Sequence, residues 1–127
     1  MTLKYIINKS TTRCLYNVNI FKNNLLFGNV NFQIYNTTAY LNNIEVKEKK
    51  RGYGSYILTN FENYVKYNYN INKIDLLAWQ PSNDNNVLNF FEMHRYYHLN
   101  PNENPEIYDD SIIIYDLYKL TKKIEFI

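Results

Sequence analysis

The first 47 residues alternate between hydrophobic and polar positions in a way that is typical of β-strands. In the second of four such runs, hydrophobic side chains recur at every other position from Cys14 to Ile20. Asparagine tolerates left-handed backbone angles, so Asn23–Asn24 and Asn36–Thr38 are expected to be turns. Gly28 is expected to be a bulge or a point of close approach. The pattern predicts an antiparallel meander with strands at Lys4–Asn8, Arg13–Phe21, Leu25–Tyr35 and Ala39–Val46.

From Ser55 the spacing of hydrophobic residues changes to steps of three and four, which predicts a helix that ends by Asn68–Asn72. Its apolar stripe contains Ile57, Leu58, Phe61, Tyr64 and Val65. The next segment, Lys73–Trp79, is typical of a buried strand. A helix between two strands implies a right-handed crossover and a parallel strand pair.

The last third of the chain predicts a second helix and a closing strand. Pro81–Asp84 is expected to be a turn with Ser82 or Asn83 as the helix N-cap. The expected elements that follow are a helix over Val87–Tyr97, a loop over Asn100–Asp110 and a strand over Ser111–Leu120. The apolar tail through Phe126 could contact a second copy, so a homodimer is an open expectation.

The junction between the fourth strand and the first helix carries the clearest chemical signal. Lys49, Lys50 and Arg51 precede Gly52 and Gly54. Glycine permits a positive φ or a close approach of the backbone to a ligand. The free N–H groups and the dipole at a helix start bind anions, and three cations suit a phosphate-rich ligand. Two interpretations stay open: a pyrophosphate site, or an ordinary turn with a solvated charge run.

Other glycine motifs fit this junction less well. A dinucleotide-binding Gly-x-Gly-x-x-Gly would need a third glycine at Ile57, and a Walker loop needs Gly-Lys-Ser/Thr after its second glycine. Neither pattern is present.

Composition limits the remaining possibilities. A chain of 127 residues, 46% hydrophobic and 20% charged, is expected to form one globular domain over residues 1–127. A net charge of +2 does not by itself indicate nucleic-acid binding. The single cysteine, Cys14, excludes an internal disulfide, and His94 and His98 lack an obvious third ligand, so no metal site is expected. Without an apolar span or a signal-peptide pattern, a cytoplasmic protein with no membrane contact is expected.

The junction resembles the glycine motif of the GNAT N-acetyltransferase superfamily. Lys49-Lys50-Arg51-Gly52-Tyr53-Gly54 is similar to Gln/Arg-x-x-Gly-x-Gly/Ala, with lysine instead of Gln or Arg at the first position. The order of predicted elements over roughly residues 25 to 120 also resembles the family domain, and the second helix is a loose match to the family's fourth motif. Family members usually carry two helices after the first strand, and the segment from Ser10 to Asn24 is too short for them.

The resemblance implies an α+β GNAT fold. Its mixed, mostly antiparallel sheet would contain a splayed parallel strand pair and two main helices, and the first two family helices would be absent. Acetyl-CoA would lie in the opening of the strand pair, with its pyrophosphate on the glycine loop and its pantetheine arm along the fourth strand. The implied cofactor-binding residues are Ile44, Val46, Lys49, Lys50, Arg51, Gly52, Tyr53, Gly54, Ser55, Phe90 and Phe91.

Catalytic candidates follow from the same resemblance. Glu45 is the only acidic residue on the predicted fourth strand and is the candidate base; alternatively, it is a solvated glutamate. Many family members protonate the leaving thiolate with a tyrosine at a position that Phe91 occupies here, so Tyr96 or Tyr97 could replace it, or both could serve only in packing. Phe90 and Phe91 either line the thioester site or belong to the core.

The leading hypothesis is an acetyl-CoA-dependent N-acetyltransferase that needs no metal. An open groove without the usual acceptor-side helices favours a lysine or N-terminus of a protein as the acceptor. The alternatives are a small-molecule amine acetyltransferase and a catalytically silent acyl-CoA-binding module. Nucleic-acid binding is a weak third possibility, because the cations cluster at one loop and do not alternate with aromatic residues.

Overall fold

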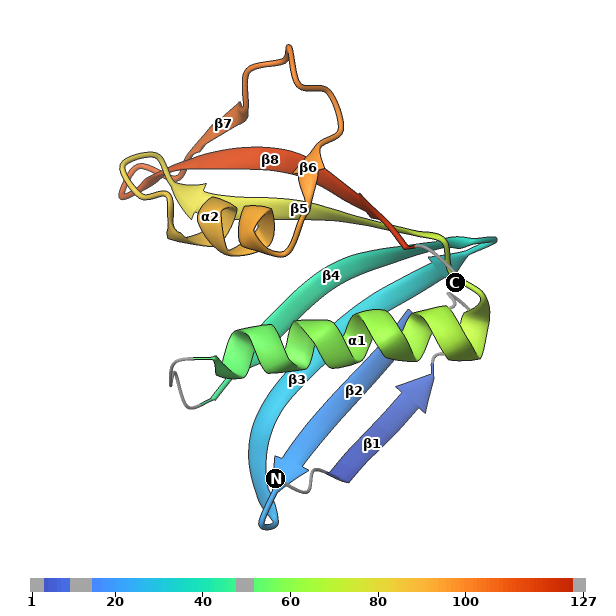
Figure 1. The fold of residues 1–127 in the computed structure, drawn as a ribbon. Coiled ribbons are helices and arrows are strands. Elements are labelled where there is room, and N and C mark those ends of the chain that lie inside the picture. The colour runs from blue at the N-terminus through green and yellow to red at the C-terminus, as the bar shows by residue number, and fades with distance from the viewer. Residues whose placement is uncertain (1–3, 10–14, 48–51, 125–127) are drawn as a thin grey trace. The chain divides into compact units, whose positions relative to one another are not determined.

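The computed structural model describes residues 4–9, 15–47 and 52–124. Eight strands and two helices follow one another along the chain (Figure 1). They are β1 (Lys4–Lys9), β2 (Leu15–Lys22), β3 (Leu25–Tyr35), β4 (Thr38–Val46), α1 (Tyr53–Tyr69), β5 (Lys73–Pro81), α2 (Asn86–Met93), β6 (Tyr97–His98), β7 (Glu106–Asp109) and β8 (Ile114–Lys123).

The strands are ordered β1-β2-β3-β4-β5-β8-β6, and β7 pairs with β8. The pairs β1–β2, β2–β3, β3–β4, β6–β8 and β7–β8 are all antiparallel. The chain divides into two compact units, residues 1–74 with 124–127 and residues 75–123, called here the first and second unit. The boundary between the two units falls within β5, whose first two residues belong to the first unit. The predicted α+β class with a mostly antiparallel sheet is confirmed, and splaying of a strand pair stays a prediction.

In the first unit, α1 covers one face of the antiparallel meander (Figure 1). Alternate residues of β2 and β3 point toward the helix and are buried, as the alternation predicts. The ring of Phe32 stacks on Tyr16 at a centroid distance of 5.0 Å and lies 5.1 Å from the ring of Phe61 on α1. From α1, the core receives Ile57, Leu58, Phe61 and Val65.

A bulge in β4 decides which of its residues face the helix. Phe32 is opposite Leu41, but Asn31 is opposite Asn43, so Asn42 is an extra residue. The inward positions of β4 therefore shift from Leu41 to Ile44. Glu45 consequently lies on the face opposite α1, together with its register partner Asn29.

Both ends of α1 depend on left-handed residues. Gly52 at the N-cap has a φ of 87°, and Asn70 at the C-cap has a φ of 53°; the backbone N–H of Asn70 donates to the carbonyl oxygen of Val65. The expected asparagine turns are confirmed, because Asn23, Asn24 and Asn36 all have positive φ. No helix precedes Tyr53 in the described part of the chain, in agreement with the predicted absence of the first two family helices.

In the second unit, β8 pairs with β6 and β7, and α2 follows β5. Leu76 and Ala78 of β5, Phe91 of α2 and Leu117 and Leu120 of β8 are buried.

The predicted N-cap of α2 is wrong, although the helix begins at Asn86, one residue before the expected Val87. Ser82 is not its cap: the Ser82 N–H donates to the carbonyl oxygen of Ile114, and its Oγ donates to Asp116 Oδ1 at 2.7 Å. The N-cap is Asn85, and the first-turn N–H of Leu88 instead donates to the buried Gln80 Oε1 at 3.0 Å. A strand residue therefore supplies the cap that was expected from the turn.

The predicted end of α2 is also wrong. The helix ends at Met93, because Arg95 adopts a φ of 70°, and Tyr97 belongs to β6. His94 and His98 therefore do not share a helix face. Within the expected loop, Glu106–Asp109 forms β7.

The closing strand begins at Ile114 and not at Ser111. Ser111 has a φ of 74°, and Asp110 Oδ1 accepts the N–H groups of Ile112 and Ile113, which makes this segment a turn. Cys14 and the tail through Phe126 lie outside the described residues.

Candidate functional site

The start of α1 leaves backbone N–H groups without intrahelical partners next to a left-handed glycine. The left-handed Gly52 turns the chain into the helix, and the first helical hydrogen bond runs from the Tyr56 N–H to the Gly52 carbonyl oxygen at 2.9 Å. The N–H groups before that bond have no intrahelical acceptor. The N-cap residue Gly52 makes no side-chain hydrogen bond to them, and no residue of the first turn is acidic. Gly52 has a positive φ, one of the two reasons expected for a glycine at this junction. Lys49, Lys50 and Arg51 lie outside the described residues.

A further cation lies beside this helix start, and the sequence did not reveal it. Lys22 Nζ donates to the hydroxyl of Tyr53 at 3.4 Å and lies 5.5 Å from the centre of its ring. The Tyr53 ring packs against Phe27 at 4.7 Å, so three elements meet here. Lys22 and Tyr53 are 31 residues apart, and only the tertiary fold brings the lysine to the helix.

The candidate residues of β4 divide between the two faces of the strand. Ile44 and Val46 are half-buried on the helix side. Glu45 lies on the other face, where its Oε1 is 2.8 Å from Lys47 Nζ and its side chain is 48% exposed. An exposed ion pair of this kind contributes little to stability. The carboxylate is therefore held near the end of β4 and remains accessible to solvent, a geometry that fits both interpretations of Glu45.

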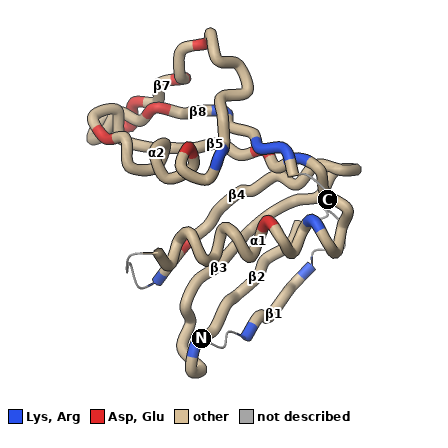
Figure 2. Tube along the Cα trace, viewed as in Figure 1, with Lys and Arg blue, Asp and Glu red and all other residues tan. Residues whose placement is uncertain are grey.

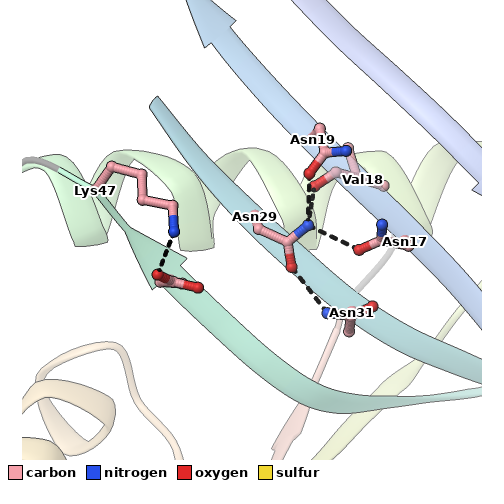
Figure 3. A network of polar contacts seen from close by, with 7 residues as sticks. Asn17, Val18, Asn19, Asn29, Asn31 and Lys47 are labelled. Carbon is pink, nitrogen blue, oxygen red and sulfur yellow. Dashed lines mark hydrogen bonds and ion pairs between the residues drawn. The ribbon is translucent and has the colours of Figure 1, made fainter. Parts of the chain in front are cut away.

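The face of the sheet that carries Glu45 is lined by asparagines (Figure 3). Asn29 Nδ2 donates to Asn17 Oδ1 at 2.7 Å and to Asn19 Oδ1 at 2.8 Å, and Asn31 Nδ2 donates to Asn29 Oδ1 at 2.8 Å. Side-chain amides that satisfy one another can leave a sheet face uncovered without exposing apolar groups. The alternating asparagines of β2 and β3 were the sequence signal for this polar face, and it was missed.

The candidates on and after α2 belong to the second unit. Phe91 is buried and packs against Phe90 at 5.2 Å and Tyr96 at 5.5 Å, so it contributes to the core of this unit. Tyr96 is 2% exposed, with Lys122 Nζ 5.4 Å from its ring, whereas Tyr97 in β6 is 47% exposed. Of the two tyrosines, only Tyr97 presents a large part of its side chain to solvent.

A second group of polar side chains lies on β8 and directly after β5. Asp116 accepts a hydrogen bond from Ser82 at 2.7 Å and, through its other oxygen, one from the Tyr118 hydroxyl at 3.5 Å. Burial, and then the negative charge of Asp116, raise the pKa of Tyr118. The phenol is thus a protonated hydrogen-bond donor at neutral pH. Sequence inspection did not single out this group, because Ser82 and Asp116 are 34 residues apart.

A metal site and a membrane-spanning helix each place requirements on the described residues. Among the described residues, no group of three or more His, Cys, Asp or Glu side chains could hold a metal ion. In the same part of the chain, no helix has the length and hydropathy needed to cross a membrane.

Solved structures with the same fold are GNAT acetyltransferases. One is a GNAT family acetyltransferase from Elizabethkingia anophelis, solved with acetyl-CoA bound. The similarity covers 96% of this chain and 98% of that protein, at a TM-score of 0.70 and 14% sequence identity. An acetyltransferase from Bacillus subtilis in complex with CoA matches 98% of this chain and 100% of its own at a TM-score of 0.71 and 13% identity. The spermidine/spermine N-acetyltransferase from Vibrio cholerae covers 89% of this chain and 67% of its own, with a TM-score of 0.72 and 13% identity.

No protein-family model matches the sequence, and no curated protein sequence matches it significantly. The structural similarity over nearly the whole chain confirms the predicted GNAT fold.

Proposed function

We propose that this protein is an acetyl-CoA-dependent N-acetyltransferase. The observation that carries the proposal is the uncapped start of α1, where Gly52 at a φ of 87° opens the first N–H groups, within a chain that has the GNAT fold. Helix N-termini of this kind bind phosphate through backbone N–H groups and the helix dipole. The pyrophosphate of acetyl-CoA is the anion that this fold would place there.

In this proposal, the phosphates contact the backbone of Gly52, Tyr53, Gly54 and Ser55. Lys49, Lys50 and Arg51 supply positive charge by their position in the sequence, and Lys22 supplies it through its contact with Tyr53. The backbone of β4 at Ile44 and Val46 pairs with the pantetheine arm. Phe90 lies at the thioester, and Phe91 supports it from the core of the second unit.

The reaction needs little acid–base chemistry from the protein. The amine nitrogen of the acceptor attacks the thioester carbonyl carbon, the C–S bond breaks, and the thiolate leaves and takes up a proton. Deprotonation of a lysine of pKa ~10.4 at pH 7 costs about 4–5 kcal/mol. Glu45 can accept that proton through water, and positioning supplies much of the remaining rate. Tyr97, which is 47% exposed, could protonate the thiolate in preference to the buried Tyr96.

The acceptor in this proposal is a primary amine on a protein, a lysine or an N-terminus. The uncovered asparagine face beside Glu45 would admit an extended substrate. The second unit attracts cations, since residues 75–123 contain eight Asp and Glu against four Lys and Arg. Figure 2 shows acidic residues along β7, β8 and the loops of this unit. The same charge would suit a polyamine, the substrate class named for the Vibrio cholerae enzyme.

The test combines a binding and a product measurement. In Gly52→Glu, a carboxylate enters the proposed phosphate site, and we expect the affinity for acetyl-CoA to fall at least a hundredfold, which is on the order of 3 kcal/mol. Gly52→Asn is the matched control, because asparagine tolerates the left-handed φ without adding charge, and no atom lies within 4 Å of a Cβ at this position. Equal affinities of the two variants, measured by calorimetry, would refute the phosphate site.

Mass spectrometry after incubation with acetyl-CoA distinguishes the acceptors. An added acetyl group of ~42 Da on lysines or N-termini of lysate proteins would support the protein acceptor, and transfer to spermidine alone would replace it by the small-molecule alternative. Tight acetyl-CoA binding without any acetylated product would indicate the catalytically silent module.

A further inference from the structure

A largely apolar groove runs between α1 and strands β1–β3, and the proposed reaction does not use it. Its volume is about 390 Å³, which is within the usual range for small-molecule sites. Ile7, Val18, Ile20 and Phe32 of the sheet line it, together with Phe61 and Tyr64 of α1. The helical residues of this lining begin one turn beyond the start of α1 and continue to its last turn, so the groove is distinct from the phosphate site.

The groove exists because β1 extends the sheet beyond the cover of α1. All six residues of β1 are exposed, although Tyr5, Ile6 and Ile7 are apolar or aromatic. Tyr5 and Ile7 point toward the groove, as its lining shows. In Figure 1, β1 lies beside the helix and not beneath it. Burying this apolar face would be favourable for any occupant that fits it.

Among the described residues, no Lys, Arg, His, Asp or Glu lines the groove, and a lysine lies near the end formed by the last turn of α1. Lys9 follows Tyr5 and Ile7 on the same face of β1, and its Nζ lies 5.4 Å from the centre of the Tyr16 ring. Tyr16 contacts Tyr69, the last residue of α1, at 5.2 Å. Lys66 lies in that same last turn, with its Nζ 5.2 Å from the ring of Tyr67, which lines the groove.

We propose that this groove binds a free anionic amphiphile: a single acyl chain along the apolar residues, with its carboxylate at the Lys9 end. The distance along β1 from Tyr5 to Lys9 is about 13 Å, which matches roughly ten carbons of an extended chain. Each methylene that becomes buried should raise the affinity roughly fourfold. The uncharged lining and the lysine at one end together select an apolar body with one negative group.

A second copy of this chain is a less suitable occupant. If two β1 strands paired antiparallel about their centres, Lys4 of each would lie opposite Lys9 of the other. Like charges directly opposite one another destabilise a strand pair, and lysines on an edge strand discourage such pairing. An extended bilayer surface also fits poorly, because the apolar lining is a groove of limited volume between a helix and a sheet.

The experiment uses decanoate below its critical micelle concentration, with decyltrimethylammonium as the probe of opposite head charge. We expect decanoate to bind with 1:1 stoichiometry in calorimetry and to shift the NMR signals of the Ile7, Val18 and Ile20 methyl groups. The ammonium probe should bind at least tenfold more weakly. Equal affinity for both probes, or shifts confined to other methyl groups, would overturn the proposal.

Strand β1 provides matched variants on its two faces. Ile6 and Ile7 are 41% and 42% exposed, and their side chains point to opposite faces of the strand. Lys4 and Lys9 are both exposed and also point to opposite faces. Lys9→Glu and Ile7→Glu should each weaken decanoate binding at least tenfold. Lys4→Glu and Ile6→Glu, on the other face of the strand, should change it less than about threefold. Equal loss in both members of a pair would overturn the proposal.

Two further measurements separate the remaining occupants. If the groove is a contact between copies, the methyl signals will shift with protein concentration in the absence of decanoate. If it is a membrane site, anionic vesicles will bind while free decanoate does not. Either result would overturn the proposal. Acetyl-CoA affinity should be the same in all four variants, so failure of this site is distinguishable from failure of the proposed acetyl transfer.

Discussion

At the scale of single residues, two glycines are required for different reasons. Gly28 has neighbours where a side chain would begin: a Cβ would lie 2.6 Å from Ile57 Cδ1 and 2.7 Å from the carbonyl oxygen of Glu45. Gly52 has open space but a φ of 87°. The sequence predicted a bulge or a point of close approach at Gly28. The strand register shifts beside it, between Gly28 and Leu26, and Ile57 of α1 and Glu45 of β4 approach it closely.

Gly28→Ala should destabilise the first unit by about 2 kcal/mol, because the backbone oxygen of Glu45 cannot move without disturbing β4. Urea unfolding measures the loss. Adding Ile57→Val removes the contact with the Ile57 side chain and should recover only part of the lost stability, since the contact with the backbone oxygen of Glu45 remains. A loss below about 0.5 kcal/mol would be that of an ordinary surface substitution and would show that the two strands separate easily at this point.

At the scale of elements, the two helices differ in how far the sequence specified them. The stripe from Ile57 to Val65 defined α1, and its glycine and asparagine ends lie close to where they were expected. Helix α2 is only eight residues long; it begins within one residue of the predicted start, but its cap and its end differ from the prediction. Its cap comes from Gln80 on β5, and its end comes from the left-handed Arg95. Neither feature has a local sequence signature, because glutamine and arginine are ordinary helix residues.

The C-terminal end of α1 provides a prediction for its stability. Asn70 holds a φ of 53° at the C-cap, a conformation that glycine adopts without strain and alanine does not. Asn70→Ala should therefore be less stable than Asn70→Gly by about 1 kcal/mol. Thermal unfolding followed by circular dichroism at 222 nm compares the two variants. Equal stabilities would mean that the last turn of α1 unwinds and relieves the alanine.

At the scale of the whole molecule, charge is divided between the two units. Residues 1–74 and 124–127 contain ten Lys and Arg and four Asp and Glu, a net charge of +6, whereas residues 75–123 have a net charge of −4. The net charge of +2 conceals this division. In the proposed function, the basic unit would attract the phosphates of acetyl-CoA and the acidic unit would attract the amine.

Acetyl-CoA binding should accordingly weaken as salt is added. The Debye length falls from about 14 Å to about 6 Å between roughly 50 and 300 mM ionic strength, so we expect the dissociation constant to rise several-fold. Calorimetry in potassium chloride measures the change, and sucrose at matched osmolarity is the uncharged control. A dissociation constant that salt leaves unchanged would mean that the cations of the first unit do not contact the phosphates.

By itself, the sequence determined the order of the main elements, the antiparallel meander, helix α1 and the left-handed glycine at its start. These features depend on residues close together in the chain: hydrophobic period, turn asparagines and glycine positions. Only the tertiary structure decided the division into two units, the position of Glu45 on the sheet face away from α1, the contact of Lys22 with Tyr53 and the groove beside β1. Each of these depends on register or on contacts between distant segments, and one extra residue in a strand, such as Asn42, reverses the faces of all that follow.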